Sequence, residues 1–476
     1  MDEKHLTPRA EDYNQWYLDV IAAADMAQHS PVKGCMVIKP YGYAIWERIQ
    51  AILDARFKET GVENAYFPLF IPQSLLTREA DHVEGFAPEV AVVTHAGGEK
   101  LEEPLVIRPT SETIMYETFK DWIHSYRDLP LLIKQWANVV RWEKRTRLFL
   151  RTTEFLWQEG HTVHATHEQA DERARMMLEV YRDFAENVMA IPVIPGQKSE
   201  SEKFAGAHRT YCLEAMMQDG RALQFATSHD LGQNFAKAFD VKFTDEQNVE
   251  QFAWQTSWGL STRTIGGLIM AHSDDKGLIV PPRLAPIQVV VVPLWFKDEQ
   301  RAEVLSQAEK IAALLKTVGV RVKIDQKEGR PGEKFYEWEK KGVPLRLELG
   351  PKDLLNEKVV VARRDSGEKE DVSFSNLAIE IPKRLEEIQG ALFARAKAYR
   401  DQRSVRVDTW DAFKMAIENG KFVLAHWCGE AEVEAKIKEE TNATIRCLPF
   451  EAPEEKGVCV LSGKPSQRRV VFARAY

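Results

Sequence analysis

The sequence predicts three domains: an α+β domain built on an antiparallel sheet, an α/β domain, and a smaller α/β domain. A chain of 476 residues is long enough for two to four domains at about 100–200 residues each. The first half begins with helical patterns and continues with β-rich segments, which favours an α+β fold. After a proline-rich stretch at 280–288, strand and helix patterns alternate, which favours α/β architecture. We expect the domains at residues 1–282, 286–398 and 404–476.

Apolar spacing places the elements of the first domain. Residues 43–60 carry Ile45, Ile49 and Leu53 on one helical stripe, and Gly61 is a natural residue to end that helix. Apolar spacing also predicts helices at 12–29 and 168–190, and β segments at 131–140, 153–165, 191–228 and 252–272. A polar loop joins the β segments at 131–140 and 153–165, which suits an antiparallel sheet.

Alternating strand and helix patterns define the other two domains. The second domain has strand patterns QVVVVPLW, VRVKID, PLRLELG and KVVVARRD, and helical patterns at 298–318, 331–342 and 376–398. The third domain begins near Val405 and contains FVLAHW, a charged helix EAEVEAKIKEE, ATIRCLPF and a strand that ends at Ala475 and Tyr476.

Composition and charge exclude several classes of protein. Hydrophobic residues make up 44% and charged residues 29%, which excludes disorder or a collagen-like repeat as the main state. No stretch reaches about 18 apolar residues and the N-terminus lacks the core of a signal peptide, so we expect no membrane span. Five cysteines cannot form a disulfide framework, so a cytoplasmic location is expected. The net charge of −8 argues against indiscriminate nucleic-acid binding, although residues 286–385 are slightly basic.

Two arginines flank the predicted β-hairpin of the first domain. Arg141 and Glu143 stand where the first strand enters the basic loop, and Arg151 and Phe155 open the return strand. Arginines fixed on strands can clamp phosphates bidentately, and a phenylalanine ring offers a face to a base. A cationic hairpin with a core phenylalanine is the alternative interpretation of these residues taken alone.

A third arginine, Arg263, precedes the apolar run TIGGLIM. An arginine at the head of a buried helix or strand needs an anionic or stacking partner, because an unpaired buried charge is costly. A structural salt bridge would satisfy it, and so would a bound phosphate. Farther upstream, the segment from Gly61 to Pro68 joins a helix end to a strand that contains a proline.

Together, in this order, these segments resemble the three signature motifs of class II aminoacyl-tRNA synthetases. The segment ending at Pro68 resembles motif 1, the dimer-interface element, and Arg141 to Phe155 resembles motif 2. Arg263 resembles the motif 3 arginine, although Thr262 stands where many of these enzymes carry an acidic residue. The chain further resembles prolyl-tRNA synthetases of the form found in archaea, eukaryotes and some bacteria, through the segments RPTSE at 108–112, FLWQEGH at 155–161, KFAG at 203–206, ATSHDLGQN at 226–234 and WQTSWG at 254–259.

This resemblance covers nearly the whole chain and implies both fold and activity. It implies a class II antiparallel catalytic sheet with flanking helices, an α/β anticodon-binding domain and a small α/β C-terminal domain. It implies that a homodimer without membrane contact attaches L-proline to tRNA(Pro) through prolyl-adenylate, with ATP and Mg²⁺.

The resemblance also assigns residues to the two small substrates. For ATP it implies Arg141, Glu143, Arg151, Thr152, Phe155, Gln224, Thr227, Ser261 and Arg263, of which Arg141 and Arg263 are catalytic. For proline it implies Phe86, Thr110, Glu112, Arg141, Trp157, Phe204 and His229. The residue chemistry agrees, because a secondary ammonium suits a carboxylate and an apolar ring suits aromatic walls. Ordinary core packing is the alternative for the aromatic residues, and a structural role is the alternative for His229.

Two other functions fit parts of the sequence. A non-catalytic relative should lack the phosphate arginines or the amine-binding acid, yet Arg141, Arg151, Arg263 and Glu112 are all present. A class II enzyme for another amino acid, such as threonine, would by resemblance use metal ligands in its catalytic core, and no matching Cys/His set is seen there. The segment between Phe155 and Arg263 is also too short to hold the editing insertion of some bacterial-type relatives.

The second domain offers candidate contacts to the anticodon. Proline anticodons end in two guanines, and guanine edges suit arginine or lysine side chains. Arg346 and Lys352 lie in the PLRLELGPKD segment and are predicted to contact them. A surface salt-bridge cluster is the alternative.

The third domain is predicted to have lost a metal site. Relatives of this form commonly hold a structural zinc there on two pairs of cysteines. Cys428 and Cys459 keep the first member of each pair, whereas Val433 and Ser462 stand in place of the second. Valine cannot bind zinc and serine is a poor ligand, so we expect no structural zinc and expect Val433 in the core. The alternative is a rebuilt site that also uses Cys447 and His426.

Overall fold

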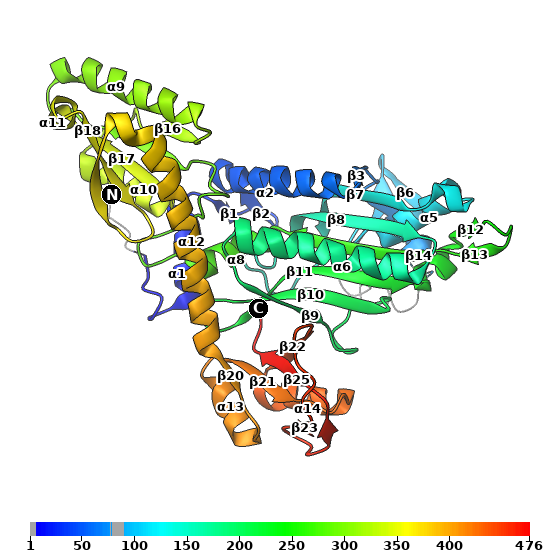
Figure 1. Ribbon diagram of the computed structural model, residues 1–476. Coiled ribbons are helices and arrows are strands. Elements are labelled where there is room, and N and C mark those ends of the chain that lie inside the picture. Colours follow the sequence, from blue (N-terminus) through cyan, green and yellow to red (C-terminus); the bar gives the residue numbers. More distant parts are fainter. Residues whose placement is uncertain (1–5, 77, 79–89) are drawn as a thin grey trace.

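The computed structural model describes residues 6–76, 78 and 90–476. We call residues up to 282 the N-terminal domain, residues 286–398 the middle domain and residues 404–476 the C-terminal domain. Figure 1 shows the middle and C-terminal domains at opposite ends of one long helix, α12 (Leu377–Arg403), which runs along the N-terminal domain.

Among the described residues, eleven strands form one continuous sheet that two domains share. In sheet order they are β20 (Ser404–Arg406), β21 (Phe422–His426), β25 (Arg469–Ala473), β22 (Thr444–Pro449), β9 (Val193–Gln197), β10 (Arg209–Met216), β11 (Ala222–Gly232), β14 (Trp254–Ser261), β8 (Glu154–His164), β7 (Leu131–Val140) and β3 (Glu63–Asn64). The domains meet where β22 pairs with β9, with Pro449 opposite Gly196. The C-terminal domain therefore extends the sheet of the N-terminal domain, which the sequence did not indicate.

Helices cover this sheet, and small sheets lie beside it. The helices of the N-terminal domain are α1 (Tyr13–Ala23), α2 (Pro40–Glu59), α3 (Gln73–Leu76), α5 (Glu112–Trp122), η2 (Tyr126–Asp128), α6 (His167–Asp183), η3 (Phe184–Val188), α7 (Asn234–Phe239) and α8 (Arg263–His272). Its small sheets are formed by β1 (Ala27–His29) with β2 (Met36–Ile38), by β4 (Phe70–Pro72), β6 (Glu99–Ile107) and β5 (Ala91–Ala96), and by β12 (Lys242–Thr244) with β13 (Glu250–Phe252).

The largest hydrophobic core lies between the sheet and helices α1, α2, α6 and α8. The predicted apolar stripe of α2 is buried there, including Ile49 and Leu53. Phe57 of the same helix lies 4.8 Å, centroid to centroid, from the ring of Trp258 on β14. Gly160 on β8 stands opposite Trp258, and any side chain there would overlap the indole. The glycine thus leaves room for the indole of Trp258 against β8.

Several element boundaries in the N-terminal domain differ from the sequence prediction. The helix predicted at 12–29 ends at Ala23, the chain turns at Asp25 with a positive φ of 56°, and residues 27–29 form strand β1. The sequence predicts β structure throughout 252–272, but β14 ends at Ser261 and helix α8 begins at Arg263. Nearly all of α8 is buried, so its apolar run has no polar face, and periodicity alone cannot separate such a helix from a buried strand. The helix predicted at 168–190 is α-helical only as far as Asp183 and continues as the π-helical turn η3.

The middle domain has a mixed sheet with helices on both faces. Its strand order is β16-β15-β17-β18-β19, with β15 parallel to β16 and β17, and the other pairs antiparallel. Val289 and Val291 pack on one face, and Val290 and Val292 pack with Trp338 on the other. The elements are β15 (Val289–Pro293), α9 (Asp298–Thr317), β16 (Val322–Ile324), α10 (Pro331–Lys340), β17 (Leu345–Leu349), α11 (Pro351–Leu355), β18 (Lys358–Arg363), β19 (Lys369–Ser373) and η4 (Phe374–Asn376). The predicted α/β architecture is confirmed.

Helix α12 connects the middle and C-terminal domains without a break. The sequence predicts its end at residue 398, but it continues to Arg403, and β20 begins at the next residue. Helices α13 (Trp410–Glu418) and α14 (Ala431–Thr441) cover one face of the C-terminal strands, and β23 (Gly457–Val458) pairs with β24 (Pro465–Ser466). No helix in the described ranges combines the length and the apolar character needed to cross a bilayer.

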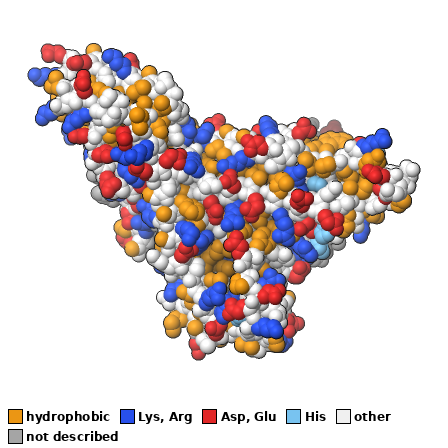
Figure 2. Space-filling view, in the orientation of Figure 1, with side chains coloured by type: hydrophobic (Ala, Val, Ile, Leu, Met, Phe, Trp, Pro, Cys, Tyr) orange, Lys and Arg blue, Asp and Glu red, His pale blue; other side chains and the backbone are white. Residues whose placement is uncertain are grey.

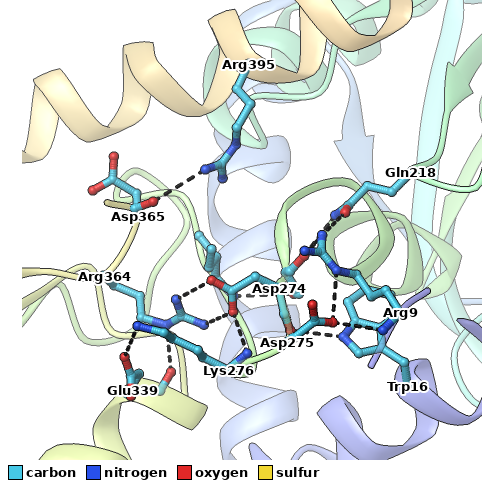
Figure 3. A network of polar contacts seen from close by, with 12 residues as sticks. Arg9, Trp16, Gln218, Asp274, Asp275, Lys276, Glu339, Arg364, Asp365 and Arg395 are labelled. Carbon is cyan, nitrogen blue, oxygen red and sulfur yellow. Dashed lines mark hydrogen bonds and ion pairs between the residues drawn. The ribbon is translucent and has the colours of Figure 1, made fainter. Parts of the chain in front are cut away.

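Polar contacts fix the middle domain against the N-terminal domain (Figure 3). Arg364 donates to the two carboxylate oxygens of Asp274 at 2.6 and 2.9 Å and to the backbone oxygen of Glu339 at 2.8 Å. The indole N–H of Trp16 donates to the backbone oxygen of Asp274 at 2.9 Å. Burial alone would raise the pKa of Asp274, but the bonds and charge of Arg364 hold it below its usual value. The two domains therefore share a partly buried ion pair as well as a chain connection.

Candidate active site

One cavity of about 220 Å³ opens on the N-terminal part of the large sheet. Strands β8, β10, β11 and β14 form its floor, and the starts of helices α5 and α8 lie at its edges. Eleven of the residues predicted from the sequence line it: Thr110, Glu112, Arg141, Phe155, Trp157, Phe204, Gln224, Thr227, His229, Ser261 and Arg263.

Strand alternation brings the residues of β8 to the cavity. Successive side chains of a strand point to opposite faces, so Phe155, Trp157, Glu159 and His161 share one face. The rings of Phe155 and Trp157 meet edge to face at 6.0 Å. The guanidinium carbon of Arg141, which directly follows β7, lies 5.5 Å and 5.4 Å from the centroids of these two rings. Arg141 is thus held over an aromatic platform, with its Nε donating to a backbone oxygen at 3.0 Å.

Arg263 provides a second cation at the same end of the cavity. It is the first residue of α8, and its Nε donates to the backbone oxygen of Leu150 at 3.1 Å. Burial, together with the charges of Arg151 and Arg141, lowers the pKa of Arg263 to about 10. Arg263 therefore stays protonated at neutral pH, and the convergence of three arginines makes this end of the cavity a site for polyanions.

Three predicted nucleotide residues lie outside the cavity lining. Arg151 is exposed and its Nη1 lies 3.4 Å from the carboxylate of Glu143. Thr152 is buried, and its hydroxyl donates to the backbone oxygen of Glu154 at 2.7 Å. Arg151 and Glu143 still act electrostatically on Arg263, so they flank the cationic end of the cavity.

The lining of the cavity also contains a buried carboxylate. Glu112 is the first residue of α5 and is 3% exposed. The hydroxyl of Thr110 donates to its Oε2. A carboxylate beside a hydroxyl that can also accept a hydrogen bond is suited to an ammonium group with two donors.

A hydrogen-bond network around Glu159, a further residue of the cavity lining, was missed by the sequence analysis. Glu159 accepts hydrogen bonds from the Ser111 hydroxyl at 2.5 Å and the Gln135 amide at 2.7 Å, and it lies 3.0 Å from Nε2 of His161. Burial alone would raise the pKa of Glu159, but these partners lower it. Burial alone would lower the pKa of His161, but Glu159 and Glu112 raise it. Glu159 and His161 both lie in the quoted FLWQEGH segment, and their period-2 spacing from Trp157 was the available signal.

Phe204 and His229 form the remaining predicted wall. Their rings lie 4.6 Å apart, and Nδ1 of His229 lies 2.9 Å from the hydroxyl of Thr210. Burial, helped by the charges of His161 and Arg141, lowers the pKa of His229 to about 3, so this ring is neutral at physiological pH. Ser257, which was not predicted, also lines the cavity, and its buried hydroxyl has no hydrogen-bond partner in the described part of the chain.

The other predicted residues lie elsewhere. Phe86 is outside the described residues. Arg346 lines a basic recess of about 190 Å³ that the middle domain forms together with Lys276 of the N-terminal domain. It donates to Glu348 at 2.8 Å and lies 4.4 Å from the ring centroid of Phe335. Lys352 lies on α11, beyond the other end of β17, and does not line that recess. The structure therefore separates the two predicted anticodon residues.

Each of the three domains matches a known protein family. Residues 94–272 match the tRNA synthetase class II core domain of the glycine, histidine, proline, serine and threonine enzymes, residues 288–384 match an anticodon-binding domain, and residues 410–476 match the prolyl-tRNA synthetase C-terminal domain. The antiparallel sheet, its cavity and these matches define a class II aminoacyl-tRNA synthetase, as predicted.

Full-length relatives specify the family. The chain is 59% identical to a proline–tRNA ligase from Chlorobium chlorochromatii over 480 residues, with 99% of each chain covered. It is 58% identical to the proline–tRNA ligases of Bacteroides fragilis and Chloroherpeton thalassium, with 99% and 100% of both chains covered, respectively. The chain belongs to the prolyl-tRNA synthetase family. The family predicted from the sequence is confirmed, and these relatives are bacterial.

Proposed function

We propose that this protein attaches proline to tRNA(Pro) in two steps within the cavity of the N-terminal domain. The observation that carries the proposal is the combination of charges in the lining of this cavity. Arg141 and Arg263 supply cations and buried Glu112 supplies a carboxylate, alongside the aromatic side chains Phe155, Trp157 and Phe204. The cations suit a triphosphate, and the carboxylate with the aromatic walls suits a small apolar amine.

In the first step, the proline carboxylate attacks the α-phosphate of ATP. The new bond joins a carboxylate oxygen to phosphorus, and the bond to the β-phosphate oxygen breaks, so pyrophosphate leaves. Glu112 and Thr110 accept hydrogen bonds from the proline ammonium, and Phe204 and Trp157 contact its ring. Arg141 holds the carboxylate against the phosphate. Positioning and charge stabilisation of this kind account for catalysis without an enzyme nucleophile.

The nucleotide occupies the cationic end. Phe155 and Arg263 hold the adenine between them, with Gln224, Thr227 and Ser261 in the lining and Glu143, Arg151 and Thr152 at the margin. The donor set is rich in arginine and has one carboxylate, Glu143, outside the lining, which fits Mg²⁺ bound mainly through phosphate oxygens and water. When bound, Mg²⁺ neutralises part of the negative charge of the phosphates.

In the second step, a hydroxyl of the terminal adenosine of the tRNA attacks the acyl carbon of prolyl-adenylate, and AMP leaves. The test is proline-dependent exchange of pyrophosphate into ATP, run against a panel of amino acids with purified protein. We expect the fastest exchange with proline and slower but measurable exchange with alanine and cysteine, because small differences in apolar size are worth only about 1–3 kcal/mol and the pocket cannot exclude these amino acids strongly. Exchange that is fastest with another amino acid would contradict the assignment.

The chain is proposed to be of the archaeal and eukaryotic-like form, with domains at 1–282, 286–398 and 404–476. Two features support this assignment. A C-terminal domain follows α12, and the chain between Phe155 and Arg263 forms sheet strands, α6, α7 and the β12–β13 hairpin. We therefore expect no clearance of mischarged alanyl-tRNA by this protein alone, measured by deacylation of that tRNA.

The middle domain is proposed to contact the anticodon of tRNA(Pro) through Arg346 and Lys352. Arg346 has the stronger support, because it lies in a basic recess with Arg363 and Lys369. Single variants separate the two residues. Arg346→Ala should weaken discrimination between tRNA(Pro) and a transcript with its two anticodon guanines replaced, and unchanged discrimination in Lys352→Ala would remove that residue from the assignment.

The N-terminal domain is proposed to form a homodimer through its β3 end. β3 is the last strand of the large sheet, and exposed apolar side chains gather near it (Figure 2). Tyr66 is 74% exposed and Trp122 is 46% exposed. Tyr66→Asp should raise the monomer fraction in sedimentation, whereas Val458→Asp, on the distant β23, should not. A wild-type protein that sediments as a monomer would exclude the dimer.

The C-terminal domain is proposed to fold without zinc. Ser462 donates to Sγ of Cys428 at 3.6 Å, and Val433 packs against the domain core. Cys447 lies apart from them, in the cluster that contains Cys212, so it is unsuited to complete a site with Cys428. Elemental analysis of wild type and Cys459→Ser tests this. Zinc that is present in wild type and lost in the variant would contradict the proposal.

A further inference from the structure

A second cluster of ligating side chains lies behind the cavity wall. His167 begins helix α6, His208 precedes β10, and Asp230 lies near the end of β11. One ligand atom from each residue lies within 4.8 Å of the others, and no other such group of three is found within the described ranges. None of these residues lines the cavity.

Each side chain of the cluster is positioned by its own contacts. The ring of His167 stacks on Trp254 at 4.6 Å. Oδ1 of Asp230 accepts a hydrogen bond from the N–H of Gly232 at 2.9 Å, which leaves Oδ2 facing Nε2 of His167 at 2.7 Å. Gly232 has a positive φ of 58°, and a Cβ there would lie 3.3 Å from Cβ of His208. Glycine at this position therefore leaves room for His208 beside the carboxylate.

His208 is the adjustable member of the group. Its side chain is exposed and forms no hydrogen bond to any residue that the structure describes, although its backbone N–H donates to the oxygen of Asp230 at 2.9 Å. Bonds to zinc of about 2.0–2.2 Å allow two ligand atoms to lie at most about 4 Å apart. A small rotation of the exposed imidazole is enough to bring all three ligands to one ion.

We propose that His167, His208 and Asp230 bind a divalent transition-metal ion, Zn²⁺ in the first instance. Two imidazoles and one carboxylate are a zinc ligand set that leaves further positions for water. The carboxylate also supplies negative charge against the dipole of α6, whose N-terminus opposes a cation. The group has the ligand number of an exchangeable site, because a closed structural site uses four protein ligands.

The chain connects this site to the wall of the cavity. Asp230 follows His229, and His208 lies between Phe204 and Thr210. The Thr210 hydroxyl contacts both Phe204 and His229. It accepts a hydrogen bond from the N–H of Phe204 at 2.9 Å and lies 2.9 Å from Nδ1 of His229. An ion bound to His208 and Asp230 therefore clamps the loop that carries Phe204 to the strand that carries His229. We infer that the bound ion tightens proline binding, an inference that rests on the proposed function.

Metal titration tests the site without any substrate. Zn²⁺ is titrated against a competing chromophoric chelator, and Co²⁺ binding is followed by its visible absorption. His208→Gln is the main variant because this side chain is exposed, and His29→Gln is a matched control at an exposed histidine outside the cluster. We expect one ion per wild-type chain, at least about tenfold weaker binding in His208→Gln, and no change in His29→Gln.

Three results would overturn the site. They are equal affinity in wild type and His208→Gln, absence of stoichiometric binding by the wild type, and a cobalt–thiolate charge-transfer band, which would place the ion on cysteines. Asp230→Asn provides a second variant, and its loss of affinity should match that of His208→Gln if it folds.

The coupling to proline is measured separately by equilibrium dialysis of labelled proline, with and without Zn²⁺. We expect severalfold tighter binding with Zn²⁺ in wild type and in His29→Gln, and no effect in His208→Gln. Unchanged proline affinity in wild type would overturn the coupling. Intact metal binding in a protein that never binds proline would contradict the proposed function instead.

Discussion

Two buried groups of ionic side chains on the same sheet are built differently: the group lining the cavity and the group at the seam between β9, β10 and β22. At the seam, Nζ of Lys198 lies 2.6 Å from Oε1 of Glu214, and Nε of Arg446 donates to Oε2 at 3.1 Å. Lys198 also donates to the backbone oxygen of Arg446 at 2.8 Å. Within the described part of the chain, no side-chain oxygen or nitrogen of these three residues is buried without a partner.

The residues that line the cavity, in contrast, include buried polar atoms without a hydrogen-bond partner in the part of the chain that the structure describes. The hydroxyl of Ser257 and the indole N–H of Trp157 are buried without partners among the residues described, and both residues line the cavity with Glu112. An unsatisfied buried polar group costs about 1–3 kcal/mol. Such a cost is reasonable where a ligand provides the missing bond. Between these two groups, the seam is fully hydrogen-bonded whereas the cavity lining keeps polar atoms available for a ligand.

The largest effect should come from breaking the seam. Glu214→Ala leaves Lys198 and Arg446 buried without an anion, which should cost about 3–5 kcal/mol in the free energy of unfolding. Urea titration measures it. The exposed acid Glu439 on α14 provides the control, because its alanine variant should stay within about 0.5 kcal/mol of wild type. A Glu214→Ala protein as stable as that control would show that the seam does not depend on its ion pairs.

The next effect should come from the cationic end of the cavity. Arg141→Ala should slow proline-dependent pyrophosphate exchange by about 10²–10³-fold, because one stabilising group at a developing charge is worth about 2.7–4 kcal/mol. Its free energy of unfolding should fall far less than that of Glu214→Ala. Near-normal exchange in the folded variant would remove Arg141 from the catalytic role.

A pair of serines sharpens the comparison. Ser257→Ala removes a hydroxyl without a protein partner, so stability should hold while the KM for proline rises about fivefold, the effect of about 1 kcal/mol. Ser228→Ala removes a buried hydroxyl that donates to the backbone oxygen of Ala174 at 2.7 Å. This control should lose about 1 kcal/mol of stability and keep the KM. The reverse pattern would contradict the assignment of unsatisfied groups to ligand binding.

The smallest effect should be the pH dependence of the Glu159–His161 pair. The pKa of His161 is raised on folding, so its contribution is complete below the unfolded value of about 6.5 and is lost as pH rises through the folded value. The pKa of Glu159 is lowered, so its contribution is present above about 4.3 and is lost as pH falls. The stability difference between wild type and His161→Gln should therefore peak between about pH 4.3 and 6.5. A difference that does not vary with pH would show that the pair is not ionised.

The sequence predicted those cavity residues whose side-chain chemistry and position in a strand or helix are both evident from the neighbouring residues. Arg141 follows β7, Phe155 lies near the start of β8 and Arg263 begins α8, and the structure brings all three to one cavity. Glu159 was missed, although it lies two residues from Trp157, because its partners Ser111 and Gln135 come from distant segments. Spacing along one strand does not reveal which remote groups will satisfy a buried acid.

Long-range features were the least predictable from the sequence. The pairing of β22 with β9 joins segments that local patterns assign to separate domains, and nothing in either strand specifies the other. Lys352 was paired with Arg346 through sequence proximity, but the end of β17 and the start of α11 carry it away from the recess. The apolar run of α8 was read as β because burial on all sides removes the periodic signal.

The shared sheet has a consequence for synthesis on the ribosome. β9 is complete at Gln197, but its partner β22 is made roughly 250 residues later, which at about 5–20 residues per second takes roughly 10–50 s. Throughout that interval the nascent N-terminal domain presents an unpaired strand edge, the kind of surface that recruits other chains. The C-terminal domain thus acts as a late cap on the edge of an earlier sheet. Chains released before Thr444 should aggregate through β9, and an N-terminal fragment made alone should need that edge blocked to stay dispersed.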